Sequence, residues 1–364
     1  MKTFRDMTPA RLEQIIERFP RLRIAVIGDF FLDKYLDIDP SLAEVSLETG
    51  KSVHQVVGIR HSPGAAGTVV CNLAALGTGT LHAIGFTGDD GESFELRKDL
   101  AALHCGTEHL ICDPRRRTPT YLKPRDKGDL SLAGEHNRYD TKNRCLTSDD
   151  LQEQMVRSLD ALLPHLDAVI ALDQVEEQDC GAITAAMAGV LAERAARHPK
   201  VVFWGDSRRR IRQFRKIIIK PNQFEAAGVE NPAPDAKLDL AVLEAAVERL
   251  RAMTGAPVCA TRGGEGMLVS DPEMTLVPGV RVEGPLDPTG AGDSATAGAV
   301  LALAAGATLP EAALMGNLVA SITVQQLATT GTARPAELPP RLALWAKQAG
   351  MRVQGAGVRG QDVG

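Results

Sequence analysis

Five short runs of apolar, largely β-branched residues restrict the fold of this chain more than any other feature. They are residues 23–28 (RIAVIG), 168–173 (AVIALD), 201–206 (VVFWGD), 217–221 (IIIKP) and 258–263 (VCATRG). A strand with one face in water alternates apolar and polar residues, whereas these runs are apolar almost throughout. Each run is followed by turn residues. We therefore expect strands that are buried on both faces.

Segments with a helical pattern separate these strands. They cover residues 149–163, 181–197, 238–254, 293–305 and 310–327. Alternation of strands and helices is typical of a parallel sheet with helices on both faces. The sequence thus predicts an α/β fold with three layers, α/β/α, around a mostly parallel sheet. Ligands of such sheets bind beyond the carboxyl ends of the strands.

Two polar stretches interrupt the alternation. Residues 30–63 and 115–138 read as turns and short strands, and we interpret them as a small β-lid on the α/β body. Residues 1–350 are then expected to form one domain, and the glycine-rich residues 351–364 a flexible tail.

Charge and composition exclude several classes of function. The formal net charge is −5 and aromatic residues make up 4%, which argues against nucleic-acid and anionic-membrane partners. The six cysteines are scattered without a C-x-x-C pair, as in reduced cytosolic proteins. The opening residues lack the apolar core of a signal peptide, and no stretch has the apolar length of a membrane span. We expect a cytoplasmic protein.

The stretch DPTGAGD, residues 287–293, stands directly before a run of small apolar residues that predicts a buried helix. Gly290, Ala291 and Gly292 leave room for an anion, above all phosphate, at the free N–H groups of the helix start. Asp293 would repel phosphate, but it suits a general base that takes a proton from a hydroxyl. The pattern predicts phosphoryl transfer to an alcohol. A helix-capping aspartate with glycine-rich packing is the alternative.

Further motifs accompany this stretch. They are IAVIGDFFLDKY (residues 24–35), SPGAAGTVVCNLAALG (62–77), KPNQFE (220–225) and TRGGEGM (261–267). Together with DPTGAGD they resemble the ribokinase-like (PfkB) sugar kinase family, most closely its heptose-phosphate kinase branch. The resemblance runs over about residues 21–344. It implies transfer of the γ-phosphoryl group of ATP to a hydroxyl of a sugar or sugar phosphate.

The resemblance also assigns the acceptor site. The implied substrate-binding residues are Asp29, Asp33, Gly64, Thr68 and Arg138. Within this set the chain departs from the family pattern, because Ala65 stands where glycine is usual, Gly67 where alanine is usual and Thr68 where asparagine is usual. A threonine keeps a hydroxyl but lacks the paired donor and acceptor of an amide. The identity of the acceptor substrate is therefore the part of the assignment that the sequence determines least.

The nucleotide side is assigned in the same way. The implied ATP contacts are Asn222, Glu225, Thr261, Gly263, Gly266 and Asn317. Asn222 and Glu225 would also hold Mg²⁺, through water, since this ion prefers oxygen ligands and keeps several waters. Asp287 and Thr289 fall where relatives often bind a monovalent cation such as K⁺. A turn followed by the first turn of a helix is the alternative reading of Asn222 and Glu225.

The lid contains cations that match the heptose-phosphate kinase branch. Arg117, Lys123 and Arg138 are candidates for binding a phosphate already present on the substrate, such as that of a heptose 7-phosphate. Exposed lid charges without a ligand are the alternative. Lids of this family often pair between subunits, so a homodimer is expected.

Two other functions stay open at this stage. The first is a kinase of the same family for ribose, fructose phosphate or a nucleoside. The second is a sensor that binds sugar or nucleotide without turnover, which the altered residues 65–68 motivate.

Overall fold

The computed structural model describes residues 1–129, 134–233, 236–327 and 330–350. The flexible tail expected for residues 351–364 lies outside this part of the chain. The helices are α1 (Pro9–Ile16), α2 (Ala66–Ala75), α3 (Gly91–Ala102), α4 (Asp149–Leu162), α5 (Ala185–Arg197), α6 (Gln223–Ala227), α7 (Leu240–Thr254), α8 (Ala291–Ala304), α9 (Leu309–Thr323) and α10 (Leu338–Gln348).

A parallel sheet forms the middle layer. Within the described residues it has seven strands, in the order β14-β13-β12-β2-β7-β8 with β9 also paired to β7. Their bounds are β2 (Arg23–Gly28), β7 (Thr80–Thr87), β8 (Cys105–Gly106), β9 (Leu110–Cys112), β12 (Ala168–Asp173), β13 (Val202–Ser207) and β14 (Ile218–Ile219). All their pairings are parallel. The three-layer α/β prediction is confirmed.

The strand predicted at residues 258–263 lies outside the central sheet. β15 (Cys259–Thr261) lies in a second sheet with β16 (Gly266–Val269), β17 (Thr275–Pro278) and β1 (Lys2–Thr3). It pairs antiparallel with β16, and two isolated parallel bridges, Ile219 to Val258 and Asn222 to Thr261, join it to the edge of the central sheet. The glycine-rich turn after β15 folds the chain straight back as a hairpin, so this strand belongs to the smaller sheet.

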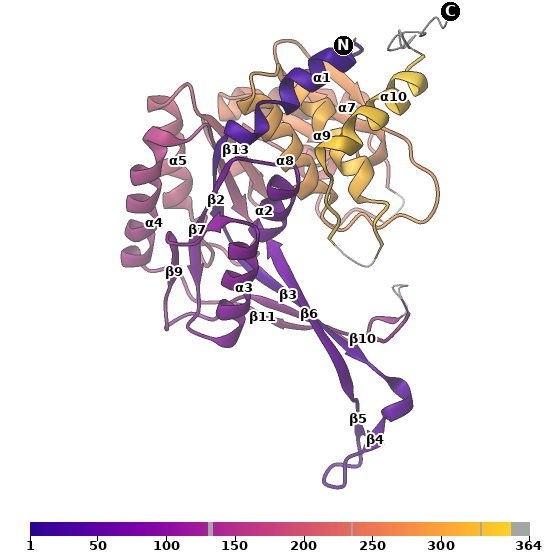
Figure 1. Ribbon diagram of the computed structural model, residues 1–364. Helices are drawn as coiled ribbons and strands as arrows, with labels where there is room; N and C mark the ends of the chain where they lie inside the picture. The colour runs from indigo at the N-terminus through magenta and orange to yellow at the C-terminus, as the bar shows by residue number, and fades with distance from the viewer. Residues whose placement is uncertain (130–133, 234–235, 328–329, 351–364) are drawn as a thin grey trace, which may run out of the picture.

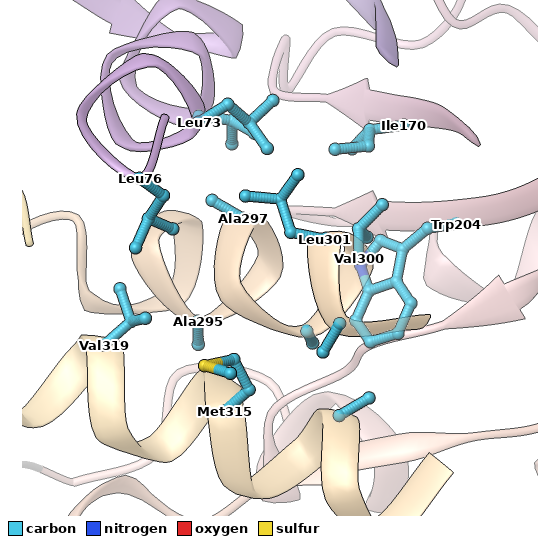
Figure 2. Packing of buried hydrophobic residues seen from close by; sticks show 14 of the residues in the cluster. Leu73, Leu76, Ile170, Trp204, Ala295, Ala297, Val300, Leu301, Met315 and Val319 are labelled. Carbon is cyan, nitrogen blue, oxygen red and sulfur yellow. The ribbon is translucent and has the colours of Figure 1, made fainter. Parts of the chain in front are cut away.

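Alternate residues of the central strands enter two separate cores. In β2, Val26 joins the core under α1, α2, α8 and α9, whereas Ile27 joins the core under α4, α5 and α7. Figure 2 shows the first core, where Leu301 of α8 points toward Leu73 of α2 and Trp204 of β13 packs beside it. This is the burial on both faces that the continuous apolar runs predicted.

A smaller sheet projects from the body. β3 (Phe30–Ile38) continues directly from β2 and pairs with β6 (Val56–Ala65) and β10 (Thr120–Asp126), and β11 (Tyr139–Thr141) completes the order β11-β10-β3-β6. The hairpin of β3 and β6 reaches far from the α/β body and ends in a ribbon of β4 (Glu44–Val45) and β5 (Ser52–Val53) (Figure 1). Both segments assigned to a lid therefore contribute strands to one sheet.

The junction of this sheet with the body contains a strained residue. Ala65, the last residue of β6 and the N-cap of α2, has φ 52° and ψ −116°. This region favours glycine and costs a residue with a Cβ roughly 1–3 kcal/mol. The departure from the family's glycine at this position therefore carries a conformational cost.

We predict that Ala65→Gly stabilises the protein. Relief of strain should exceed the roughly 0.5–1 kcal/mol that glycine costs through the unfolded chain. The expected net gain is about 1 kcal/mol, or a rise of about 2–4 °C in Tm by calorimetry. The control Ala66→Gly, which lies within α2 and is fully buried, should lower Tm. A lower Tm for Ala65→Gly would contradict the assignment of strain.

Candidate active site

Aspartates mark the carboxyl ends of three neighbouring strands. Asp29 follows β2, Asp173 ends β12, and Asp206 lies near the end of β13. Since parallel strands deliver their carboxyl ends to one edge, these side chains share one rim of the sheet. All three are less than one tenth exposed.

Asp29 holds the loop that follows β12. Its Oδ2 accepts hydrogen bonds from the backbone N–H groups of Gln174 (2.8 Å) and Val175 (3.0 Å), and its Oδ1 accepts one from Ala182 (2.7 Å). Burial raises the pKa of Asp29, although these backbone donors oppose the rise. The sequence predicted a contact between Asp29 and sugar hydroxyls. The geometry instead directs both carboxylate oxygens to the loop, so we revise its role to that of a positioning residue.

A buried ion pair lies between β13 and the segment after β14. Lys220 Nζ is 2.8 Å from Asp206 Oδ2, and both residues are more than nine tenths buried. The charges of Glu225 and Asp293 also act on the Lys220 ammonium. A Cβ placed on Gly292 would lie 3.5 Å from Lys220 Nζ. The ammonium therefore faces the first turn of α8.

The start of α8 has the geometry expected of an anion site. Gly290, its N-cap, has φ 75° and ψ 5°, which favours glycine, and Ala291 and Gly292 follow as the first helical residues. No side chain caps the helix at Gly290. The backbone N–H groups of the first turn thus face the same space as the Lys220 ammonium.

Asp293 is a half-buried carboxyl in the first turn of α8. Burial and the nearby charge of Asp206 raise its pKa to about 7, while Lys220 opposes this rise. Because the folded-state pKa lies above the usual value of about 4, ionisation of Asp293 destabilises the folded protein as pH rises from about 4 to 7. A carboxyl that exchanges its proton near neutral pH suits general acid–base chemistry.

The acceptor residues predicted from the sequence face Asp293 from the lid side. Asp33 of β3 is 3.1 Å from Lys123 Nζ of β10, and its charge acts on Asp293. A Cβ on Gly64 would lie 2.9 Å from Asp33 Oδ2, so only glycine allows this approach of β6 to β3. Thr68 is buried in α2, and its Cγ2 would lie 3.4 Å from a Cβ on Gly290. The structure therefore brings Asp33, Gly64 and Thr68 close to the N-terminus of α8.

Asn222 and Glu225 begin α6 with reciprocal caps. Asn222 Oδ1 accepts from the backbone N–H of Glu225 (2.9 Å), and Glu225 Oε2 accepts from the backbone N–H of Asn222 (2.7 Å). This is the helix-start alternative for the pair. It engages the single side-chain oxygen of Asn222, which also accepts from the N–H of Phe224 (2.9 Å), and one of the two carboxylate oxygens of Glu225. Burial raises the pKa of Glu225, and the charge of Asp206 adds to the rise. The second carboxylate oxygen of Glu225, near the charge of Asp206, is the kind of oxygen ligand that fits Mg²⁺.

A cavity of about 790 Å³ lies on the side of the α8 N-terminus that faces β15, β16 and α9. Its lining includes four residues assigned to the nucleotide, Thr261, Gly263, Gly266 and Asn317, together with Ala291 and Gly292. A largely apolar cavity with a few polar groups at one end is the usual form of a small-molecule site.

Two of these residues also shape the cavity wall. Gly266 has φ 100°, and a Cβ there would lie 2.1 Å from the carbonyl oxygen of Val277. Asn317 of α9 donates from Nδ2 to the carbonyl oxygens of Val277 (3.1 Å) and Pro278 (3.2 Å). Both residues therefore fix the end of β17 against the cavity.

The lid cations already have partners. Lys123 pairs with Asp33, and Arg138 donates to both oxygens of Asp140 (2.7 and 2.8 Å) and lies over the ring of Tyr121. The side chain of Arg117 is exposed. These arrangements do not gather the three cations in one phosphate pocket.

The candidate monovalent-cation residues precede α8. Asp287 Oδ1 accepts from the backbone N–H of Thr289 (3.0 Å), and the backbone N–H of Asp287 donates to Val324 after α9 (2.8 Å). The two residues thus form a turn before α8 that is tied to the end of α9, and a cation site there stays a prediction.

Lys220 is the important residue that sequence reasoning did not assign. A signal was present, because a lysine ends the apolar run IIIK at the carboxyl edge of a strand. Lysine is rarely buried without a carboxylate partner, so this position calls for one. The partner, Asp206, is 14 positions earlier in the chain and on another strand, which no local pattern reveals.

Comparison with known proteins decides the family. A model described as "pfkB family carbohydrate kinase" matches residues 23–336. The chain belongs to the pfkB family of carbohydrate kinases. It is accordingly a phosphotransferase that acts on an alcohol group, and the resemblance seen in the motifs is confirmed.

Curated relatives cover most of this chain. "Bifunctional protein HldE" of Desulfatibacillum aliphaticivorans is 29% identical over 336 residues, or 90% of this chain and 64% of that protein. The protein of the same name from Caulobacter vibrioides is 31% identical over 330 residues, or 87% of this chain and 63% of that protein. The chain therefore spans somewhat less than two thirds of the length of these relatives.

Solved structures show the same fold at lower identity. Escherichia coli phosphofructokinase-2 in complex with fructose-6-phosphate gives a TM-score of 0.64 at 17% identity, covering 90% of this chain and 99% of that one. Arabidopsis thaliana ribokinase complexed with ribose and ATP gives 0.60 at 16%, covering 89% and 97%. The pfkB chain thus has a ribokinase-like fold. Among its described helices, none has the length and apolar character needed to cross a bilayer.

We predict that Lys220→Met destabilises this pfkB protein by about 3 kcal/mol, because it leaves the buried Asp206 without its cation. Urea unfolding followed by circular dichroism measures the change. The double variant Lys220→Met, Asp206→Asn removes both charges and should recover more than half of the loss. A double variant as unstable as the sum of the two single variants would show that the pair is not energetically coupled.

Proposed function

We propose that this protein is an ATP-dependent kinase that phosphorylates a hydroxyl of a sugar or sugar phosphate. The observation that carries the proposal is the placement of Asp293. This carboxyl lies at the N-terminus of α8, between a 790 Å³ cavity lined by Thr261 and Asn317 and the lid residue Asp33. The phosphoryl donor, ATP, in the cavity and the acceptor hydroxyl on the lid side would meet at this carboxyl.

Asp293 acts as the general base. Its carboxylate takes the proton of the acceptor hydroxyl as the hydroxyl oxygen attacks the γ-phosphorus of ATP, and the bond to the β,γ-bridging oxygen breaks to release ADP. With a pKa of about 7, Asp293 is substantially ionised at neutral pH and still basic enough to accept the proton. Activity should therefore rise with pH up to and beyond pH 7.

Lys220 and the amides of the α8 first turn stabilise the transferring group. The ammonium is held by Asp206 at 2.8 Å, so it does not need to reorganise when negative charge develops. Gly290, Ala291 and Gly292 keep side chains out of this space. Asn222 and Glu225 would hold Mg²⁺, which neutralises phosphate charge when bound.

The lid positions the acceptor. Asp33 offers a carboxylate fixed by Lys123, and Thr68 offers a hydroxyl beside Gly290. Asp29 contributes indirectly, because it fixes the loop 174–182 that borders the site. The lid also excludes water, which would otherwise compete with the acceptor for the phosphoryl group.

The relatives named HldE support a phosphorylated heptose as acceptor, such as a heptose 7-phosphate. Ribose, fructose phosphate and a nucleoside are the alternatives within the family, and the low aromatic content disfavours the nucleoside. An Escherichia coli phosphofructokinase-2 solved in complex with potassium supports K⁺ near Asp287 and Thr289.

A homodimer through the lid is also part of the proposal. The outer part of the lid exposes large apolar side chains, including Val45, Leu47, Val56 and Ile59. Four such side chains on one projecting ribbon form a patch that a second copy of the lid would cover.

The test is sugar-dependent release of ADP. We expect turnover when the protein is incubated with ATP, Mg²⁺ and a panel of sugars and sugar phosphates that includes heptose 7-phosphates. Asp293→Asn should lower kcat by at least 1000-fold while ATP binding, measured by calorimetry, stays within a few-fold. The control Glu153→Gln, on the exposed face of α4, should behave as wild type.

Two results would overturn the proposal. ATP binding without ADP release for any acceptor would favour a sensor without turnover, which the residues Ala65, Gly67 and Thr68 motivate. Full activity of Asp293→Asn would remove Asp293 as the base.

A further inference from the structure

Arg208 is the first residue after β13, two positions beyond Asp206. It begins the basic run Arg208, Arg209 and Arg210. In the structure the end of β13 lies against α8, where Thr296 Oγ1 is 3.5 Å from Asp206 Oδ2. Arg208 therefore leaves the sheet beside the helix that carries Asp293.

The backbone of this turn is held rigidly. The N–H of Arg208 donates to the carbonyl oxygen of Asp173 (3.0 Å), and the buried Ser207 Oγ accepts from the N–H of Arg210 (2.7 Å) while it donates to Asp173 Oδ2 (2.7 Å). The Arg210 guanidinium closes the turn on Asp173 Oδ1 (2.6 Å). A fixed backbone presents the Arg208 side chain from a defined point at the rim.

The side chain itself is loosely held. It is 51% exposed, and its Nε is 3.2 Å from Glu176 Oε1. Glu176 has two further cations close by, Arg209 at 4.0 Å and Lys142 at 3.9 Å. An exposed ion pair of this kind contributes little stability, and Glu176 would keep two cations if Arg208 left.

The charges of the reaction centre explain why Arg208 matters. Lys220 is engaged by Asp206 and Lys123 by Asp33, so moving either would leave a buried carboxylate unpaired. Arg208 can move without that cost. Its charge also acts on Asp293, Glu225 and the lid residue Tyr121.

We propose that Arg208 leaves Glu176 when both substrates are bound and contacts the transferring phosphoryl group. It forms no covalent bond. The γ-phosphoryl group passes from ATP to the acceptor oxygen and ADP leaves, the acceptor proton goes to Asp293, and the guanidinium stabilises the charge on the equatorial oxygens. This assignment rests on the proposed kinase activity.

The experiment compares Arg208→Gln with Arg209→Gln. Arg209 is a neighbouring cation of similar exposure that faces the same Glu176. With ATP, Mg²⁺ and the acceptors that the wild type uses, Arg208→Gln should lower kcat about 100-fold with little change in the acceptor KM. Arg209→Gln should stay within about threefold of wild type. Arg208→Lys should recover part of kcat, because it keeps the charge but loses the planar fork.

The pH profile separates this role from a structural one. Arg208 lowers the pKa of Asp293 against the larger effects of burial and Asp206, so Arg208→Gln should move the acidic limb of kcat to higher pH. If Arg208 had only a structural role, Arg208→Gln would lower kcat without shifting the acidic limb of the pH profile.

Each contrary result has a distinct meaning. If the wild type releases no ADP with any acceptor, the kinase activity itself fails. If the wild type is active and Arg208→Gln keeps its kcat, the role of Arg208 is overturned. A raised KM for phosphorylated acceptors alone, with kcat unchanged, would also overturn it and assign Arg208 to the acceptor's own phosphate.

Discussion

The site depends on a single buried cation. Lys220 pairs with Asp206 at 2.8 Å, and the charges of Glu225 and Asp293 also act on its ammonium. Without the ammonium, three carboxylates at one rim would be unfavourable, because Asp206 is buried and Glu225 and Asp293 are half-buried. With it, Asp206 and Lys220 form a pair, and Asp293 keeps a pKa of about 7 that is suited to proton exchange at neutral pH.

The fold brings these groups together by two general devices. Parallel strands deliver their carboxyl ends to one rim, and α8 directs its free amides toward the same place. The lid then continues from β2 through β3, so Asp33 and the body are linked by a few residues of one chain. The acceptor side and the phosphoryl side are thereby positioned by adjacent elements.

Much of this was predictable from sequence because it is local. Continuous apolar runs revealed the central strands, and the small residues before α8 indicated a candidate anion site with Asp293 beside it. Pairings between distant segments were not predictable. Lys220 needs Asp206 from another strand, and Asp29 engages a loop about 145–153 positions away. The strained Ala65 was visible as a departure from a motif, but its φ of 52° was not.

The central claim is that burial and neighbouring carboxylates keep Asp293 protonated until about neutral pH. The most direct measurement is a carboxyl ¹³C NMR titration of protein labelled at aspartate, with the Asp293 signal identified by its loss in Asp293→Asn. The account predicts a midpoint near pH 7. A midpoint near pH 4, the value of an ordinary aspartate, would contradict it.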